Sequence, residues 1–242
     1  MASKGKETGV TWYGHATFLF ETPGGKRVMI DPWVQGNPSC PDNLKKVENL
    51  DVMLITHGHF DHIEDAVQVA KDANPKSVVG IFEIADWLGK KGVENLIGMN
   101  KGGTVEVEGI KVTMLHADHS CGIQDDDGSI IYGGEAVGYL IELENGFKIY
   151  HSGDTAIFGD MRLYGELFAP DMAVLPIGDH FTMDPRQAAY AAEMLGVKRV
   201  IPSHYATFPL LTGTPAKLRE ELKKRNYNCE VIELQPGSIR EL

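Results

Sequence analysis

Residues 16–31 and residues 137–150 share one pattern: an apolar run, a turn that contains glycine, and a second apolar run. Apolar runs of strand length around Gly-Gly or Asn-Gly turns predict β-hairpins. An aspartate follows each hairpin closely, Asp31 after the first and Asp154 after the second. The two hairpins suit a core of two β-sheets with related halves.

Further apolar runs, rich in β-branched residues or in Leu and Met, predict additional strands at residues 51–56, 77–81, 110–115, 172–176, 199–202 and 229–234. Helices are predicted between them, at residues 64–73, 83–90, 185–195 and 215–225, with Asp184 and Thr214 as the N-caps of the last two. This alternation predicts an α/β fold with sheets inside and helices outside. The 242 residues contain no linker-like tract, so one domain is expected over residues 1–242.

Composition and charge narrow the classes of partner. The net charge of −11 disfavours nucleic acid and anionic membranes as partners, which leaves a small-molecule substrate as the expectation. Arg162 and Arg186 are the candidates for a local basic pocket. The three cysteines are odd in number and widely spaced, and no apolar run has the length of a signal peptide or a membrane span. A cytoplasmic location is therefore expected.

The segment Thr56-His57-Gly58-His59-Phe60-Asp61-His62 follows an apolar strand and carries the densest group of ligand-type side chains in the chain. Imidazole and carboxylate groups suit zinc, iron or manganese. An extended segment places His57, His59 and Asp61 on one side, and the turn after Asp61 directs His62 elsewhere, so one peptide can serve two metals. The alternative is a polar loop that caps the next helix, but imidazoles this close repel on protonation when no cation is present.

Other histidines also fall just after predicted strands, where loops carry function and the sheet fixes their geometry: His119, His151, His180 and His204. A single loop histidine is more often hydrogen-bonded than metal-bound. The cluster at residues 57–62 raises the expectation that some of these histidines are ligands. Cys121 is expected to be a packed thiol.

These residues resemble the metallo-β-lactamase superfamily, whose dinuclear members carry a Thr-His-x-His-x-Asp-His loop, then a lone His, a bridging Asp and a last His. The resemblance implies an αββα four-layer sandwich, with two mixed β-sheets packed face to face and helices outside. It also implies two divalent metal ions, zinc first, with manganese or iron as alternatives. The implied ligands are His57, His59 and His119 for the first ion, Asp61, His62 and His204 for the second, and Asp154 for both.

More narrowly, the chain looks like an uncharacterised branch of metal-dependent hydrolases near the L-ascorbate 6-phosphate lactonase group. The motifs that carry this likeness are residues 12–15, 30–32, 175–179, 181–183, 202–205 and 207–209. In that branch the third ligand histidine precedes a serine, which favours His119 and leaves His116 as the alternative. The intact His59 disfavours flavodiiron oxidases, and the chain has no large insert of the kind found in RNA-processing nucleases.

The resemblance implies a hydrolase in which two metals lower the pKa of a water for attack on a small, anionic ester, lactone or phosphoester. The candidates for proton transfer to the leaving group are Asp61, His15, His180 and Tyr205. Asp31 and His151 are expected to orient metal-bound imidazoles, and the alternative is a structural role, for Asp31 as the cap of its turn. The alternatives are a phosphodiesterase, an iron redox enzyme and a metal-binding scaffold. The related lactonase group also implies a homo-oligomer.

Overall fold

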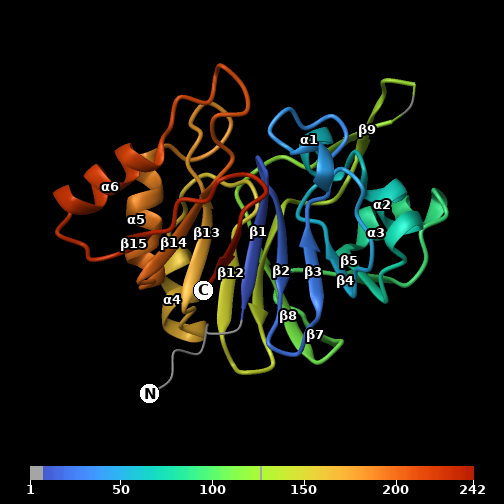
Figure 1. Ribbon diagram of the computed structural model, residues 1–242, viewed down its shortest axis with the longest axis horizontal. Coiled ribbons are helices and arrows are strands. Elements are labelled where there is room, and N and C mark those ends of the chain that lie inside the picture. Colours follow the sequence, from blue (N-terminus) through green and yellow to red (C-terminus); the bar gives the residue numbers. More distant parts are fainter. Residues whose placement is uncertain (1–7, 126) are drawn as a thin grey trace.

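Two mixed β-sheets pack face to face, and helices cover their outer sides (Figure 1). The computed structural model describes residues 8–125 and 127–242. This architecture agrees with the αββα sandwich implied by the resemblance. Among the described residues, no helix combines the length and the apolar character needed to cross a membrane.

The first sheet contains the N-terminal hairpin. Its strands, in spatial order, are β16 (Ile239–Glu241), β1 (Gly9–Gly14), β2 (Thr17–Glu21), β3 (Arg27–Ile30), β4 (Val52–Leu54), β5 (Ser77–Ile81) and β6 (Leu96–Met99). The pairings from β16 to β3 are antiparallel, and those from β3 to β6 are parallel. The predicted hairpin is confirmed, because β2 pairs with β3.

The second sheet contains the other predicted hairpin, β11 paired with β12, which is also confirmed. Its strands, in spatial order, are β15 (Glu230–Val231), β14 (Arg199–Ser203), β13 (Met172–Pro176), β12 (Lys148–His151), β11 (Val137–Glu142), β8 (Ile110–His116) and β7 (Thr104–Val107). The pairings from β15 to β12 are parallel. A separate two-stranded ribbon joins β9 (Gly122–Gln124) and β10 (Ile130–Tyr132).

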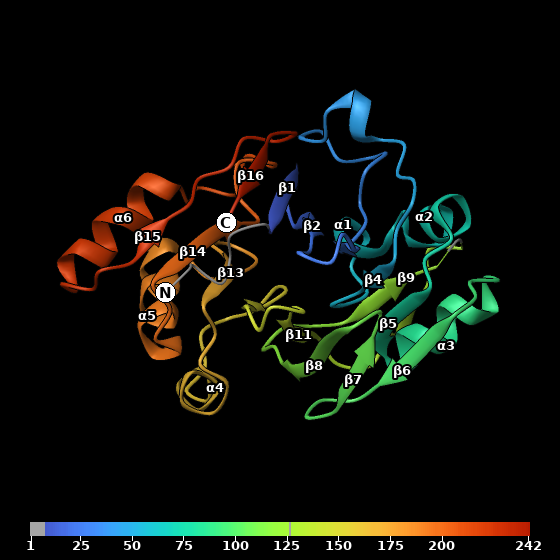
Figure 2. The ribbon, with the colours of Figure 1, turned by 60° about the horizontal axis from the view of Figure 1, so that its bottom comes forward.

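Helices flank the two sheets on opposite sides of the molecule, with α2 and α3 beside β4 to β6 and α5 and α6 beside β13 to β15 (Figure 2). The helices are α1 (Phe60–Ile63), α2 (Ala66–Ala73), α3 (Phe82–Lys90), α4 (Met161–Phe168), α5 (Pro185–Leu195) and α6 (Pro215–Lys224), with a 3-10 turn at Asp42–Leu44. The predicted caps are confirmed, because Asp184 accepts the backbone N–H of Gln187 and Thr214 accepts that of Lys217.

Some elements escaped prediction. The helix expected at residues 64–73 corresponds to α2, which begins two residues later, and the short helix α1 before it was not predicted. The helix α4 was not predicted, and its interior glycine, Gly165, weakens the helical signal. The strands β6, β7, β9, β10 and β16 have at most four residues each, which is too short for a clear apolar period. The strand β1 was also missed.

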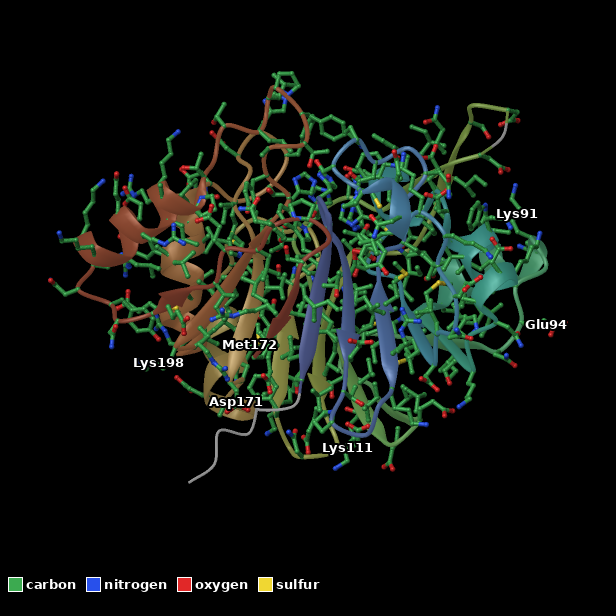
Figure 3. The ribbon with its side chains drawn as sticks, viewed as in Figure 1. Lys91, Glu94, Lys111, Asp171, Met172 and Lys198 are labelled. Atoms are coloured by element: carbon green, nitrogen blue, oxygen red, sulfur yellow. The ribbon has the colours of Figure 1, made fainter. Side chains whose placement is uncertain are left out.

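The two sheets are joined where the functional loops begin. The hydroxyl of Tyr139, in β11, donates to the carbonyl oxygen of Ile55 just after β4, at 2.6 Å. The backbone N–H of Val137 donates to the carbonyl oxygen of Thr56, at 3.0 Å. Figure 3 labels Lys111, Asp171 and Lys198 near the starts of β8, β13 and β14, at the edge opposite α1. The loops that leave these strands therefore gather at the α1 edge.

Candidate metal centre

Histidine and aspartate side chains from both sheets meet at the edge where α1 lies. Each side chain lies in a segment that follows the carboxyl end of a strand. Asp31 follows β3, the segment His57 to His62 follows β4, His119 follows β8, Asp154 follows β12, and His204 follows β14. Ligand sites in α/β sheets commonly form at the carboxyl ends of strands, because the sheet fixes where each loop begins. Segments far apart in the sequence thus supply one site.

The first group of imidazoles contains His57, His59 and His119. The Nε2 atom of His57 lies 3.0 Å from Nδ1 of His59, and Nε2 of His119 lies 3.2 Å from the same Nδ1 atom. Each residue offers one nitrogen, and these nitrogens all lie within 4.8 Å of one another. This group has the composition expected for the first ion.

The second group contains His15, Asp61, His62 and His204, which also offer ligand atoms within 4.8 Å of one another. Oδ2 of Asp61 lies 2.9 Å from Nε2 of His15 and 3.6 Å from Nε2 of His204. The set expected for the second ion is therefore brought together, and His15 joins it. The side chain of His15 is fully buried.

Asp154 lies between the two groups. Its Oδ2 atom is 3.0 Å from Nε2 of His204 and 3.3 Å from Nε2 of His62, both in the second group. The same oxygen is 3.8 Å from Nε2 of His119 and 4.0 Å from Nε2 of His57, both in the first group. One carboxylate oxygen thus faces imidazole nitrogens of both groups, which is the placement expected of a bridging ligand.

Hydrogen bonds fix the imidazoles of the site loop from behind. The hydroxyl of Thr56 donates to Oδ2 of Asp31 at 2.6 Å, so it can only accept at its 2.9 Å contact with Nδ1 of His57. The same Asp31 oxygen lies 2.8 Å from Nδ1 of His62. With their Nδ1 atoms donating, His57 and His62 turn their Nε2 atoms toward the centre.

His59 is held in the opposite orientation. Its Nε2 atom lies 3.1 Å from the hydroxyl oxygen of Ser120, which leaves Nδ1 for the first group. His15 is held by Thr207, whose hydroxyl oxygen lies 2.9 Å from Nδ1 of the ring. His15 therefore connects Thr207 to the carboxylate of Asp61.

Residues of the site adopt backbone conformations that favour glycine. The φ angles of His15, Asp31 and His204 are 56°, 50° and 54°, in the left-handed region. Such a conformation costs a non-glycine residue about 1–2 kcal/mol. Strained backbone conformations are common at functional sites. The surrounding structure keeps the backbone in the strained conformation, which places the side chain where the function requires it.

Electrostatics keep the first group neutral. Burial lowers the pKa of His57, His59 and His119, and the imidazoles around each ring lower it further. Neutral imidazole is the form that binds a metal ion.

In the second group, neighbouring carboxylates raise the pKa values of two histidines. Burial is the largest single effect on His204 and disfavours its charge, but the carboxylates of Asp154 and Asp61 together outweigh burial and raise the pKa of His204 to about 9. Asp154 and Asp31 likewise hold the pKa of His62 well above its usual value against the effect of burial. Charged histidines keep the pKa of Asp154 well below its usual range, although burial opposes this.

The donor set fits divalent metal ions. Nε2 of His57 carries a lone pair directed at His59, and Nε2 of His62 is fully buried without a hydrogen-bond partner among the described residues. A cation between the two groups would neutralise the buried carboxylates and accept the lone pairs of the imidazole nitrogens. The described residues at the centre match the ligand types of zinc, manganese and iron alike.

A cavity of about 910 Å³ opens onto the centre. Five residues of the two groups and the bridge line it: His59, Asp61, His119, Asp154 and His204. The cavity also reaches Gln124 and Gly128, so both ends of the acidic segment at residues 124–128 lie beside the site. Asp126 of that segment lies outside the described residues.

Three of the four predicted proton-transfer residues do not line this cavity. His180 is exposed, and its ring lies against Phe181. Tyr205 stacks on Trp12 with ring centroids 5.1 Å apart, and burial raises the pKa of its phenol to about 12. His15 is enclosed behind Asp61. Of the four predicted residues, only Asp61 lines the cavity. The proton-transfer roles of His15, His180 and Tyr205 stay predictions.

Other expectations need correction or refinement. His116 lies against Phe158 and joins none of the candidate ligand groups among the described residues, in contrast to His119. Nδ1 of His151 accepts the backbone N–H of Gly153, so His151 shapes the loop of Asp154, and it has no hydrogen bond to an imidazole among the described residues. The Cys121 thiol is buried and donates to the carbonyl oxygen of Gly133.

Some residues of the site were missed in the sequence. Thr207 and Ser120 stand inside the family motifs, but no spacing rule connects Thr207 to His15 across 192 positions. The apolar residues that line the cavity were also missed: Phe60, Ile130, Phe181, Phe208, Pro209 and Leu210. Phe60 and Phe181 directly follow the histidines His59 and His180, and this adjacency was the available signal.

Comparisons with known proteins agree with this geometry. The family model described as "Beta-lactamase superfamily domain" matches residues 26–205. A UPF0173 metal-dependent hydrolase of Koribacter versatilis (strain Ellin345) is 58% identical over 228 residues, which cover 94% of this chain and 95% of the relative. Another, from Roseiflexus sp. (strain RS-1), is 52% identical over 242 residues and covers 98% of each chain.

A solved structure shares the fold over nearly its full length. Igni18 of Ignicoccus hospitalis KIN4/I, described as a novel metallo hydrolase, superposes with a TM-score of 0.82 at 33% identity, covering 96% of this chain and 97% of its own. The narrower likeness to the ascorbate 6-phosphate lactonase group stays a prediction. The matches along the whole chain establish that it belongs to the β-lactamase superfamily and, within it, to the UPF0173 metal-dependent hydrolase family.

Proposed function

We propose that the chain is a metal-dependent hydrolase with a dinuclear centre that cleaves a small ester or lactone. One observation carries the proposal: Oδ2 of Asp154 faces both groups of imidazoles where the cavity meets them. The names of the relatives and of Igni18 support the hydrolase class.

The proposed ligands are His57, His59 and His119 for one ion and Asp61, His62 and His204 for the other, with Asp154 shared. Divalent ions held there would lower the pKa of a water and polarise the bond under attack. Hydrolysis adds one water across that bond: the hydroxyl joins the acyl carbon, and the oxygen of the leaving group takes a proton.

The residues of the chain position the reaction. Asp61 is proposed to pass the proton to the leaving group, because it alone of the predicted proton-transfer residues lines the cavity. His15 orients the Asp61 carboxylate through its 2.9 Å contact. Asp31 and Thr56 keep the imidazoles of His62 and His57 in the tautomers that face the centre.

The test is turnover of a neutral aryl ester and a simple lactone by protein stripped with a chelator and reloaded with zinc or manganese. Reloaded protein should hydrolyse at least one of them, and Asp154→Asn should lose more than about a hundredfold in kcat/KM. The matched control is Asp72→Asn, an exposed carboxylate on α2, which should retain wild-type activity. Bound metal without hydrolysis of either substrate would contradict the proposal and favour a scaffold.

A further inference from the structure

The wall of the cavity is built from apolar side chains of four separate segments. They are Phe60 at the start of α1, Ile130 in β10, Phe181 after β13, and Phe208, Pro209 and Leu210 after β14. Figure 1 shows the β9 ribbon and the loops that follow β13 and β14 at the same edge as α1. Segments from both halves of the chain thus turn apolar groups toward one space.

These side chains are unusually open to solvent. Ile130 is 80% exposed, and Phe60, Phe181 and Leu210 are about half exposed, at 49%, 50% and 52%. Single exposed apolar residues are common, but several that converge on one hollow mark a binding surface. The apolar wall is continuous with His59, Asp61 and His119, so a bound molecule would meet the metal centre and the wall together.

The same wall lacks positive charge. None of the described residues that line the cavity is a lysine or an arginine, and Arg162 and Arg186 are not among them. Its polar side chains outside the centre are those of Ser120 and Gln124, which are uncharged. An anionic group that lies on this wall, away from the metal centre, would therefore place its charge against apolar groups, in a protein whose net charge is −11.

We propose that the cavity binds an uncharged, apolar acyl chain, so that the substrate is a neutral ester or lactone with an alkyl or aryl side chain of several carbons. This inference rests on the proposed function and names its substrate class. Drug-sized ligands occupy pockets of about 300–1,000 Å³, and the cavity is near the upper end of that range. An acetyl group would leave most of this wall in contact with water.

A series of esters with one alcohol tests the inference. The acyl groups are acetyl, butyryl, hexanoyl and octanoyl, and a further ester replaces the terminal methyl of the hexanoyl chain by a carboxylate. We expect kcat/KM to rise about two- to fourfold for each added methylene, since a buried methylene contributes about 0.8 kcal/mol. The carboxylate analogue should be at least about tenfold poorer than its neutral partner.

Variants assign the effect to the wall. Phe181→Ser and Ile130→Ser should each lower kcat/KM for the octanoyl ester about tenfold, and should lower that for the acetyl ester much less. The matched control is Phe82→Ser, because Phe82 is also an exposed phenylalanine, at 63%, and does not line the cavity. Phe82→Ser should leave the whole series unchanged.

A binding measurement keeps the inference separate from the proposed function. The neutral fluorophore N-phenyl-1-naphthylamine should bind the wild type and the Phe82→Ser variant, should bind Phe181→Ser several-fold more weakly, and should be displaced by octanoyl esters. If no ester is cleaved but this pattern holds, the proposed function fails and the apolar site stands. If esters are cleaved with no dependence on chain length, or the carboxylate analogue is preferred, the inference is overturned and the proposed function stands.

Discussion

Asp31 holds two parts of the site loop in place although it touches no substrate cavity. Its Oδ1 atom accepts the backbone N–H of Thr56 at 2.8 Å, and its Oδ2 atom accepts the Thr56 hydroxyl and Nδ1–H of His62. The residue is fully buried and adopts a left-handed backbone conformation. A carboxylate with these partners determines which nitrogen of His62 faces the centre.

Asp31→Asn should weaken metal binding. Both oxygens of Asp31 accept hydrogen bonds, and the NH2 group of asparagine would place a second donor against the donor of His62 or Thr56. We expect a loss of about 10- to 100-fold in metal affinity and of about 1–3 kcal/mol in the free energy of unfolding. Competition with a chromophoric chelator and denaturant unfolding measure the two effects. Asp51→Asn is the control, because Asp51 also accepts a backbone N–H, that of Arg27, but lies before β4. An equal loss of metal affinity in both variants would argue against the role of Asp31.

Thr207 positions His15, which in turn orients Asp61. Thr207→Val removes the hydroxyl and keeps the shape, so kcat should fall about three- to tenfold with little change in KM. Thr207→Ser should restore most of kcat. Steady-state kinetics on one ester checks both variants, and a Thr207→Ser variant as slow as Thr207→Val would show that the methyl group matters rather than the hydrogen bond.

At the scale of elements, the loops after β13 and β14 pack backbone against backbone. A Cβ atom at Gly178 would lie 2.1 Å from the carbonyl oxygen of His204, and one at Gly213 would lie 1.6 Å from that of Ile177. Neither contact can be relieved by rotating a side chain. Glycine at these positions therefore lets β13 approach the loop that carries His204.

Gly178→Ala should displace His204 and weaken the second group of ligands. We expect the variant to bind about one ion per chain instead of two and to lose about 1–3 kcal/mol of stability. Elemental analysis and thermal unfolding measure these effects. Gly159→Ala provides the comparison, because no atom lies within 4 Å of its added Cβ. Two ions retained in Gly178→Ala would refute the packing argument.

Sequence reasoning succeeded where the signal is local. The hairpins and the caps at Asp184 and Thr214 follow from turns, capping residues and apolar runs within short windows. The ligand residues were grouped through a motif, and the geometry of His57, His59 and His119 agrees with that grouping. The packing of Tyr205 on Trp12 and of His180 on Phe181 could not be predicted, because a residue's neighbours along the chain do not show which way its side chain packs.

The apolar cavity was beyond prediction for a related reason. Its wall combines four segments that meet only after both sheets have formed, and each segment alone contains one or a few apolar residues in a loop. Phe181 and Leu210 differ from core residues in their solvent exposure, which a sequence alone does not show.

At the scale of the whole molecule, the proposed ligands come from both sheets. His57, His59, Asp61 and His62 follow a strand of the first sheet, while His119, Asp154 and His204 follow strands of the second. Ions bound between them would connect the two sheets across the edge of the core. Metal binding should therefore stabilise the native fold as well as supply the chemistry.

Removal of metal should lower the melting temperature. An ion present at a hundred times its Kd contributes about 2.7 kcal/mol, which corresponds to a shift of roughly 5–10 °C for a chain of this size. Differential scanning calorimetry with and without a chelator measures the shift, and zinc added in excess should restore it. In Asp154→Asn the ligand proposed to be shared by both ions is weakened, so removal of metal should lower the melting temperature of this variant by less than that of the wild type. Equal melting temperatures for stripped and reloaded wild type would contradict a structural link through metal.

The metal content of the purified, reloaded wild-type chain tests the central claim most directly. Elemental analysis together with an accurate protein concentration gives the number of ions per chain. The arrangement of two ligand groups around Asp154 predicts about two divalent ions. One ion or none per chain after reloading would contradict the dinuclear centre.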